Sequence, residues 1–319
     1  MEHREALLAL RTFLSTQILG QEKLIERLLI ALLADGHMLV EGAPGLAKTK
    51  AIKELAEGIE AQFHRIQFTP DLLPADITGT EIYRPETGSF VFQQGPIFHN
   101  LVLADEINRA PAKVQSALLE AMAERQVSVG RSTYELSPLF LVMATQNPIE
   151  QEGTYPLPEA QLDRFLMHGK IGFPDATVER KILQQARGEA LNGETKPERR
   201  VSQQAILDAR KEILGLYMAD AVEEYLVQLV MATRIPAKFD PEMAEWIAYG
   251  ASPRGSIALD RCARAHAWLA GRDFVSPEDI QAVLFDVLRH RIILSFEAEA
   301  AGIDQDRVVQ RILDVVAVA

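Results

Sequence analysis

The sequence predicts an α/β protein with a parallel sheet, followed by a smaller helical domain. Five apolar runs of strand length are separated by helix-like segments, and they lie at 38–40, 63–68, 101–104, 139–144 and 168–173. Alternation of this kind is typical of a sheet with helices on both faces. A Gly-rich turn follows the first run, and after about residue 175 the patterning becomes helical.

Other elements are predicted around this sheet. The first thirty-odd residues have the apolar spacing of two helices, joined at 18–21. Segments near 83–92 and 127–136 place turn residues between short β-prone stretches, so we expect hairpins that protrude from the sheet. A polar linker at 192–198 divides the predicted domains, 1–190 and 200–319. The second domain is predicted to hold only helices, at about 202–216, 219–233, 253–270, 277–289 and 305–316.

Composition limits the class of protein. The 319 residues are 48% apolar with a mean hydropathy of −0.01, which is typical of a soluble globular chain. No apolar run approaches the roughly 18–20 residues that span a membrane. The single cysteine, Cys262, excludes an intramolecular disulfide and a Cys-based zinc site, and no secretory pattern is seen, so we expect a cytoplasmic location. The net charge of −12 makes a nucleic-acid partner unlikely on composition, because such proteins usually carry a basic patch.

A phosphate-binding loop is predicted between the first apolar run and a helix. Its residues are Gly42, Ala43, Pro44, Gly45, Leu46, Ala47, Lys48 and Thr49. In a loop of this kind backbone N–H groups and the helix N-terminus hold phosphate oxygens. We expect Lys48 to reach the β- and γ-phosphates and the Thr49 hydroxyl to ligate Mg²⁺. Ala47 stands where the general pattern has glycine, and a left-handed backbone there would cost on the order of 1–2 kcal/mol.

Three further segments supply the other parts of a nucleoside triphosphate site. Asp105 and Glu106 follow the third apolar run, so Asp105 would hold the Mg²⁺ shell and Glu106 would orient or deprotonate the attacking water. Asn147 follows the fourth run and would hydrogen-bond the γ-phosphate or the water. Arg164 and Arg254 lie near helix ends, where the pattern taken singly favours a surface arginine, paired with Asp163 in the case of Arg164.

Taken together, these segments resemble the MoxR-type AAA+ ATPases over essentially the whole chain. Residues 42–49 are similar to the Walker A segment of that family, including its alanine, and 103–111 to the Walker B segment. The stretch 144–165 is the most specific, and it matches the sensor-1 asparagine at Asn147 and the arginine finger at Arg164. Arg254 matches the sensor-2 arginine of the family's lid domain.

The resemblance implies a P-loop AAA+ core with a five-stranded parallel sheet and a small all-helical C-terminal lid. It implies a homo-oligomeric ring, a hexamer, that binds ATP and Mg²⁺ between protomers. Arg164 would then reach the neighbour's γ-phosphate, while the subunit served by Arg254 stays open. The two hairpins resemble the helix-2 insert and the pre-sensor-1 hairpin of this clade, and would face the pore or the substrate. Family members act as chaperone-like ATPases, often with a protein that bears a von Willebrand factor A domain.

We therefore predict an ATP-hydrolysing remodelling factor that helps partner proteins mature or become active. One alternative is a nucleotide-gated scaffold with little turnover, against which the intact Glu106 argues. Others are a motor of the metal-chelatase type and a DNA-dependent motor of the same superfamily. The charge of −12 disfavours DNA. The sequence names no client protein.

Overall fold

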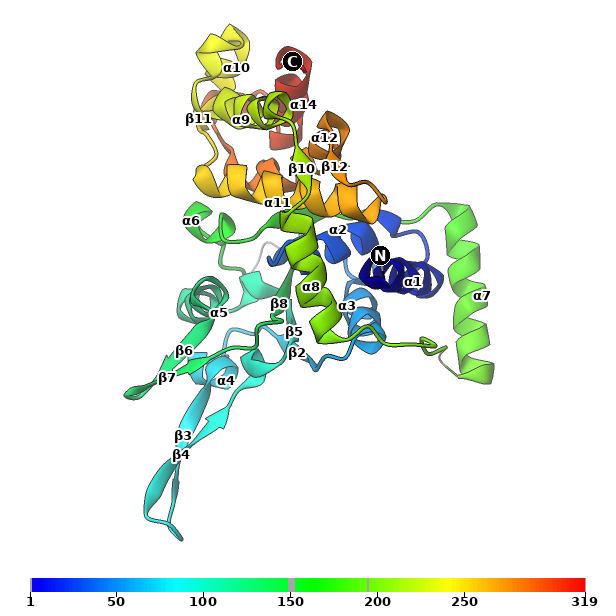
Figure 1. Cartoon of the computed structure of the whole chain (residues 1–319). Coiled ribbons are helices and arrows are strands. Elements are labelled where there is room, and N and C mark those ends of the chain that lie inside the picture. The colour runs from blue at the N-terminus through cyan, green and yellow to red at the C-terminus, as the bar shows by residue number, and fades with distance from the viewer. Residues whose placement is uncertain (1, 149–152, 194, 319) are drawn as a thin grey trace.

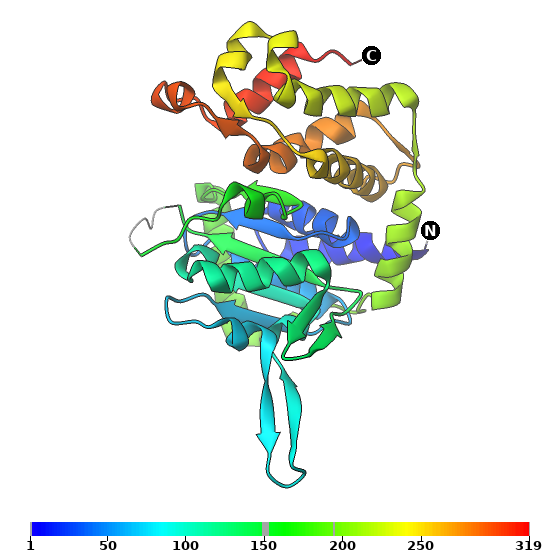
Figure 2. The ribbon, with the colours of Figure 1, turned by 90° about the vertical axis from the view of Figure 1, so that its left-hand side faces the viewer.

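The computed structural model describes residues 2–148, 153–193 and 195–318. An α/β core lies between a largely helical lid and a long hairpin that projects from the opposite end of the molecule (Figures 1 and 2). Residues 149–152 of the MoxR-like segment and residue 194 of the predicted linker lie outside the described residues.

The core is built on a five-stranded parallel sheet with the order β2–β5–β8–β1–β9. The strands are β1 (Met38–Glu41), β2 (Phe63–Gln67), β5 (Leu101–Asp105), β8 (Leu141–Gln146) and β9 (Met167–Lys170). Strands β1, β5 and β8 are almost wholly buried, as expected where helices cover both faces. The predicted fold class is confirmed. The last strand ends at Lys170 rather than Phe173, because its partner β1 ends opposite it at Glu41.

Helices cover the two faces of the sheet, and the strand pleat divides the core between them. On one face α1 (Glu2–Gln17), α2 (Glu22–Leu33) and α3 (Lys48–Gly58) pack with Met38, Val40, Leu101, Leu103, Leu141 and Met143. On the other face α4 (Pro74–Thr78) and α5 (Ala112–Glu124) pack with Leu39, Val102, Ala104, Val142 and Ala144. Alternate residues of each strand therefore enter different cores.

Two antiparallel hairpins extend from the core. The first consists of β3 (Gly79–Arg84) and β4 (Ser89–Gln94), and it is the long projection in both views (Figures 1 and 2). The second consists of β6 (Gln126–Val129) and β7 (Ser132–Glu135). The ring of Phe92 stacks on that of Tyr134 with centroids 4.0 Å apart, so the two hairpins contact each other.

Short elements and a peripheral helix complete the core. The short ones are η1 (Pro96–Phe98), η2 (Ile107–Arg109) and α6 (Glu159–Leu162). Helix α7 (Ala176–Asn192) lies at the side of the molecule, and none of its described side chains is fully buried (Figure 1). The carboxylate of Asp175 caps it by accepting from the N–H groups of Thr177 and Val178.

The lid is largely helical. Its helices are α8 (Gln203–Leu214), α9 (Asp220–Arg234), η3 (Pro236–Lys238), α10 (Pro241–Trp246), α11 (Pro253–Leu269), α12 (Pro277–Leu288), η4 (Arg289–Arg291), α13 (Phe296–Ala300) and α14 (Gln305–Val315). The prediction that this region holds only helices is wrong. The strands β10 (Tyr217–Met218) and β12 (Phe274–Val275) pair, as do β11 (Ile247–Tyr249) and β13 (Ile293–Leu294). Strands of two or three residues are too short for an alternating pattern to reveal them.

The lid and the core share one apolar interior. Helix α8 packs against α1 and α2 of the core and against α11 of the lid. A single cluster of buried apolar residues therefore runs from the α1–α3 face of the sheet into the lid. Asp286 of α12 adds a buried ion pair, because its carboxylate lies 2.7 Å from Nε of Arg27 in α2. The boundaries at 190 and 200 stay a prediction. None of the described helices is long and apolar enough to cross a membrane.

Candidate functional site

The turn after β1 forms the wall of a cavity. It has a volume of about 370 Å³ and is lined by Pro44, Gly45, Leu46, Ala47, Lys48, Thr49, Lys50, Arg65, Asp105, Glu106 and Asn147. Two glycines shape the turn for different reasons. A Cβ at Gly42 would lie 2.4 Å from Cγ1 of Ile171, so there is no space for one. Gly45 has open space around it but a φ of +82°, which glycine adopts without steric cost.

Ala47 has a left-handed backbone, with φ 57° and ψ 16°, immediately before α3 begins at Lys48. This conformation costs an L-residue about 1–2 kcal/mol. It also belongs to the kind of turn in which successive N–H groups line one concavity and bind anions. Because residue 47 is alanine and not glycine, the backbone of the loop is strained at this position.

Lys48 lies across the loop. Its Nζ donates to the carbonyl oxygen of Gly42 over 2.6 Å. Partial burial lowers the pKa of Lys48, while the nearby carboxylates of Asp105 and Glu106 raise it. The ammonium group is therefore held over the turn, on the side of the cavity that faces two acids.

Asp105 is the last residue of the buried strand β5, and both of its carboxylate oxygens have partners. Oδ1 accepts from the hydroxyl of Thr145 over 2.6 Å, and Oδ2 accepts from Nη2 of Arg65 over 2.7 Å. The Thr145 oxygen also accepts from the backbone N–H of Glu106 over 2.9 Å. Thr145 on β8 therefore fixes the positions of both acidic residues.

Glu106 follows Asp105 with a left-handed backbone, φ 56° and ψ 50°. Its Oε2 accepts from Nε2 of Gln67 over 2.7 Å and from Nη1 of Arg109 over 3.2 Å. Gln67 ends β2, and its Cα lies opposite Asp105 in the parallel register. Both carboxylates are therefore held by neighbouring donors.

Sequence reasoning did not select four of these donors: Arg65, Gln67, Thr145 and Arg109. The signal for two of them was present, because Arg65 and Gln67 alternate along a run already predicted to be a strand. Placing that strand beside β5 would have indicated that they face Asp105 and Glu106. The order of the strands comes from tertiary structure, however, and the chain order does not reveal it.

The two expected arginines lie elsewhere. Arg164 and Arg254 line a second cavity of about 280 Å³, and neither lines the cavity of the Gly-rich turn. Nη1 of Arg164 donates to the carbonyl oxygen of Leu119 over 2.8 Å. Nη1 of Arg254 lies 4.0 Å from Oδ2 of Asp163.

The two cavities lie at opposite ends of the sheet. The backbone N–H of Leu166, just before β9, bonds to the carbonyl oxygen of His37, just before β1. Arg164 therefore lies near the amino ends of these strands, whereas the Gly-rich turn leaves the carboxyl end of β1. The four residues of β1 span about 13 Å at about 3.3 Å per residue. Arg164 is thus too far to reach a phosphate held by its own turn.

The first cavity has the donor set of a polyphosphate site. It combines an ammonium group, the N–H groups of a strained turn, a helix N-terminus and two carboxylates. Within the described part of the chain, no group of three or more His, Cys, Asp or Glu side chains could hold a metal ion. Mg²⁺ is usually bound through one or two carboxylates together with substrate phosphates, and Asp105 and Glu106 line this cavity.

Known proteins are similar to this chain over most of its length. Residues 37–167 match the model of the ATPase family associated with various cellular activities (AAA), and residues 242–312 match the AAA lid domain. The chain is 47% identical to Chaperone MoxR1 of Mycobacterium tuberculosis, over 94% of this chain and 79% of that protein. It is 35% identical to Protein MoxR of Paracoccus denitrificans, over 87% of this chain and 86% of that protein.

The chain belongs to the MoxR family of AAA+ ATPases.

A solved structure shares the whole architecture of this MoxR-family chain. It is the crystal structure of a protein assigned as an ATPase from Cytophaga hutchinsonii, with a TM-score of 0.93 and 46% identity. The match covers 100% of this chain and 96% of that one. The AAA region at 37–167 contains the Gly-rich turn, Asp105, Asn147 and Arg164, and the lid region at 242–312 contains Arg254.

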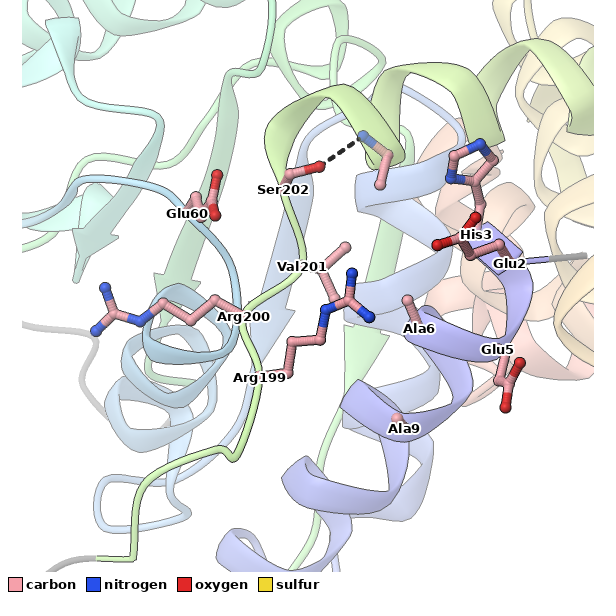
Figure 3. Close-up of a pocket in the computed structure, with 11 residues that line it drawn as sticks. Glu2, His3, Glu5, Ala6, Ala9, Glu60, Arg199, Arg200, Val201 and Ser202 are labelled. Carbon is pink, nitrogen blue, oxygen red and sulfur yellow. Dashed lines mark hydrogen bonds between the residues drawn. The ribbon is translucent and has the colours of Figure 1, made fainter.

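A larger cavity of this MoxR-family chain, about 720 Å³, lies away from both sites (Figure 3). It separates the first turns of α1 from the segment that enters α8. Its charged lining is mixed and includes Glu2, Glu5, Glu60, Arg199 and Arg200. The hydroxyl of Ser202 is used locally as the cap of α8. Volume alone therefore does not identify a functional site here.

Proposed function

We propose that this chain is an ATP-hydrolysing remodelling factor that works as a ring, with each nucleotide bound between two copies. The observation that carries the proposal is the division of the charged residues. Lys48, Asp105 and Glu106 share one cavity, whereas Arg164 and Arg254 share another at the opposite end of the sheet. A second copy packed head to tail would bring the two cavities together.

The chain's own groups have distinct roles in this proposal. Lys48 and the N–H groups of the turn hold the phosphates, and Thr49 and Asp105 hold Mg²⁺. Mg²⁺ bound there supplies neutralising charge to the phosphates. Glu106 orients or deprotonates the attacking water, and Asn147 helps to place it. For this Arg65 must turn away from Asp105, which its half-exposed side chain permits.

Both arginines serve the neighbouring copy in the proposed ring. Arg164 supplies positive charge to the neighbour's γ-phosphate, as arginine fingers do. The sequence does not decide whether Arg254 acts on the nucleotide of its own copy or on that of the neighbour. The structure supports the neighbour, because Arg254 shares a cavity with Arg164 and not with Lys48.

The proposed cellular role is chaperone-like. It rests on the relative named Chaperone MoxR1. The proposal also includes a hexameric ring, a cytoplasmic location and a partner with a von Willebrand factor A domain, which the family resemblance implies. The long hairpin would contact the client. Its strands expose Tyr83 and Phe90, whose ring centroids are 5.3 Å apart, on a projection well clear of the core (Figure 2).

ATP turnover by three variants tests the proposal. We expect Glu106→Gln and Arg164→Ala each to bind ATP and to lose hydrolysis. Mixing Arg164→Ala with Lys48→Ala should restore part of the activity, because an intact turn then meets an intact arginine across some interfaces. Wild-type turnover by Glu106→Gln would contradict the role of Glu106, and the absence of restoration at every mixing ratio would contradict the shared site.

One observation favours a second candidate, a nucleotide-gated scaffold with little turnover. Arg65 and Arg109 bind the carboxylates of Asp105 and Glu106, as expected of a site that is not ready for hydrolysis. Assaying hydrolysis with and without a candidate partner separates the two functions. A scaffold would bind ATP and the partner while turnover stays at the background of Glu106→Gln.

A further inference from the structure

The cavity that holds Arg164 and Arg254 is unusually rich in positive charge. Five arginines line it, against two carboxylates, although the whole chain has a net charge of −12. The arginines are Arg125, Arg164, Arg254, Arg261 and Arg291, and the acids are Asp35 and Asp163. An excess of cations in a partly closed space attracts an anion from outside.

The two carboxylates are already used within the chain. Oδ1 of Asp35 lies 2.7 Å from Nη2 of Arg125 and 2.7 Å from Nη1 of Arg210. Oδ1 of Asp163 accepts from Nε of Arg291 over 2.8 Å, and Oδ2 accepts from the hydroxyl of Ser252 over 2.8 Å. Neither acid is therefore available to balance a further cation.

Arg261 is the arginine of this lining that has no partner among the described residues. Its side chain is half-buried, and within the described ranges no hydrogen bond or ion pair joins it to another residue. Its charge acts on its surroundings all the same. Burial lowers the pKa of Arg210, Asp35 raises it, and the nearby charges of Arg125 and Arg261 lower it further.

The position of Arg261 on α11 directs it to the same side as Arg254. The two residues are seven positions apart, which is close to two helical turns, so they lie on one face about 10 Å apart. Ile257 and Ala258 lie between them and also line the cavity. The face of α11 that carries the proposed trans-acting Arg254 therefore presents a second guanidinium group.

We infer that Arg261 binds a phosphate oxygen of the nucleotide held by the neighbouring copy, as a third cation beside Arg164 and Arg254. The inference rests on the proposed ring function. The same cavity would then grip the triphosphate at more than one point along its length. The arginine cavity holds more cations than carboxylates, and a neighbouring copy with bound nucleotide would supply the missing negative charge.

The charges of the opposing surface favour phosphate over a protein carboxylate. Around the Gly-rich turn, the lining acids Asp105 and Glu106 are held by Arg65 and Arg109 of their own copy. Lys50 is paired there with Glu189, over 2.7 Å, so that acid is also engaged. Each acid that lines this cavity is therefore engaged within its own copy, and a bound triphosphate would add the negative charge that Arg261 meets.

The test compares Arg261→Gln with Lys211→Gln, which removes one charge from an exposed side chain outside both cavities. We expect Arg261→Gln to bind ATP as wild type does and to lose turnover by about tenfold, the scale of one hydrogen bond to a charged group. Lys211→Gln should keep wild-type turnover. Mixing Arg261→Gln with Lys48→Ala should restore part of the loss, because the intact arginine then faces an intact turn.

Assembly measured by mass photometry, without nucleotide, with ADP and with ATP in the Glu106→Gln background, identifies the anion. Arg261→Gln should assemble like its parent without nucleotide and more weakly than its parent with ATP. Equal weakening in all three conditions would overturn the inference and indicate a carboxylate of the neighbouring copy. Turnover equal to that of Lys211→Gln would also overturn it.

The failure of the proposed function would look different. If mixing Arg164→Ala with Lys48→Ala restores turnover but mixing Arg261→Gln with Lys48→Ala does not, only the role of Arg261 fails. If wild type itself shows no turnover and neither nucleotide changes assembly, the ring ATPase proposal fails and the role of Arg261 fails with it.

Discussion

The two cavities of this chain differ in how their charges are balanced. Around the Gly-rich turn each lining carboxylate is held by donors of the same chain, among them Arg65 and Arg109. The arginine cavity holds five cations and two acids, and Arg261 has no hydrogen bond or ion pair among the described residues. The carboxylates of the first cavity are therefore each held by a cation before a ligand arrives, and the second cavity has the larger excess of cations. The imbalance is what one expects of half a site that is completed by another molecule.

The largest expected effect is a difference between variants of the two cavities in ATP binding and in turnover. Lys48→Ala should abolish ATP binding, because the ammonium group over the turn is lost. Arg164→Ala should keep ATP binding within about twofold and lower turnover by about a thousandfold or more, the scale reported for arginine fingers. Fluorescent-nucleotide titration and a phosphate-release assay measure the two quantities. Loss of ATP binding in Arg164→Ala would break the comparison, since the arginine would then serve its own turn.

A second prediction concerns the framework of the arginine cavity. Asp163→Ala should lower the free energy of unfolding by about 3 kcal/mol, because it leaves the buried guanidinium of Arg291 without its carboxylate. Turnover should fall as well, since Asp163 lies between Arg291 and Arg254. Urea unfolding measures the stability. The control Asp208→Ala removes the half-buried partner of the exposed Lys211, and stability should change by less than about 1 kcal/mol.

ATP binding by folded Asp163→Ala sharpens the same comparison. It should equal that of wild type, because the Gly-rich turn is at the other end of the sheet. Weaker ATP binding in a variant that remains fully folded would show that the two cavities are coupled within one copy.

A third prediction uses the histidine in the wall of the arginine cavity. Burial, and after it the charge of Arg125, lowers the pKa of His37 to about 3. The folded chain therefore keeps this ring neutral at pH values where the unfolded chain, with an ordinary pKa of about 6.5, binds a proton. The contribution of His37 to the free energy of unfolding is fully present above about pH 6.5. It decreases as the pH falls, by about 1.4 kcal/mol per pH unit.

Urea unfolding as a function of pH checks the sign and the size. Between about pH 6.5 and pH 5 the His37 contribution should amount to about 2 kcal/mol. His290 is also buried with its pKa well below the ordinary value, and it adds in the same direction. His37→Gln should therefore reduce the slope and not remove it. An unchanged slope would mean that His37 takes up its proton in the folded chain.

A fourth prediction tests the balance around the Gly-rich turn. Arg65→Ala should lower the Mg²⁺ concentration needed for half-maximal turnover several-fold, because the guanidinium no longer competes for Oδ2 of Asp105. The exposed Arg84, on the distant hairpin, provides the control Arg84→Ala. Titration of ATPase activity with Mg²⁺ makes the measurement. An increased requirement for Mg²⁺ would show instead that Arg65 helps to hold the nucleotide.

The sequence predicted the parts of the molecule that depend on local pattern. The five sheet strands, the turn before Lys48 and the helices that begin at Pro253 and Pro277 all follow from periodicity or from residue types at fixed spacing. The short lid strands could not be predicted, because two residues have no period.

The arrangement of the site was harder to predict than its members. Arg65 faces Asp105 only because β2 lies beside β5, and a single sequence does not state the order of its strands. The separation of Arg164 from Lys48 has the same origin. The two residues lie at opposite ends of parallel strands, and the proposal of a site shared between copies rests on this separation.

The smallest expected effect is at Ala47, where the balanced cavity carries backbone strain. Ala47→Gly should raise the free energy of unfolding by about 0.5–1 kcal/mol. Relief of the left-handed strain, about 1–2 kcal/mol, exceeds the entropy that glycine loses on folding, about 0.5–1 kcal/mol. The control Ala51→Gly lies inside α3 with right-handed geometry, and it should destabilise by about 1 kcal/mol.

ATP affinity decides whether that strain has a function. If the left-handed turn is already set for phosphate, Ala47→Gly should bind ATP slightly more weakly while it unfolds less readily, because the freer residue must be ordered on binding. Equal stability in Ala47→Gly and wild type would show that the turn holds no strain to relieve. Tighter ATP binding by Ala47→Gly would show that the left-handed backbone of Ala47 opposes the ATP-bound conformation. The charged groups of the Gly-rich turn would then be placed for phosphate, while its backbone would not.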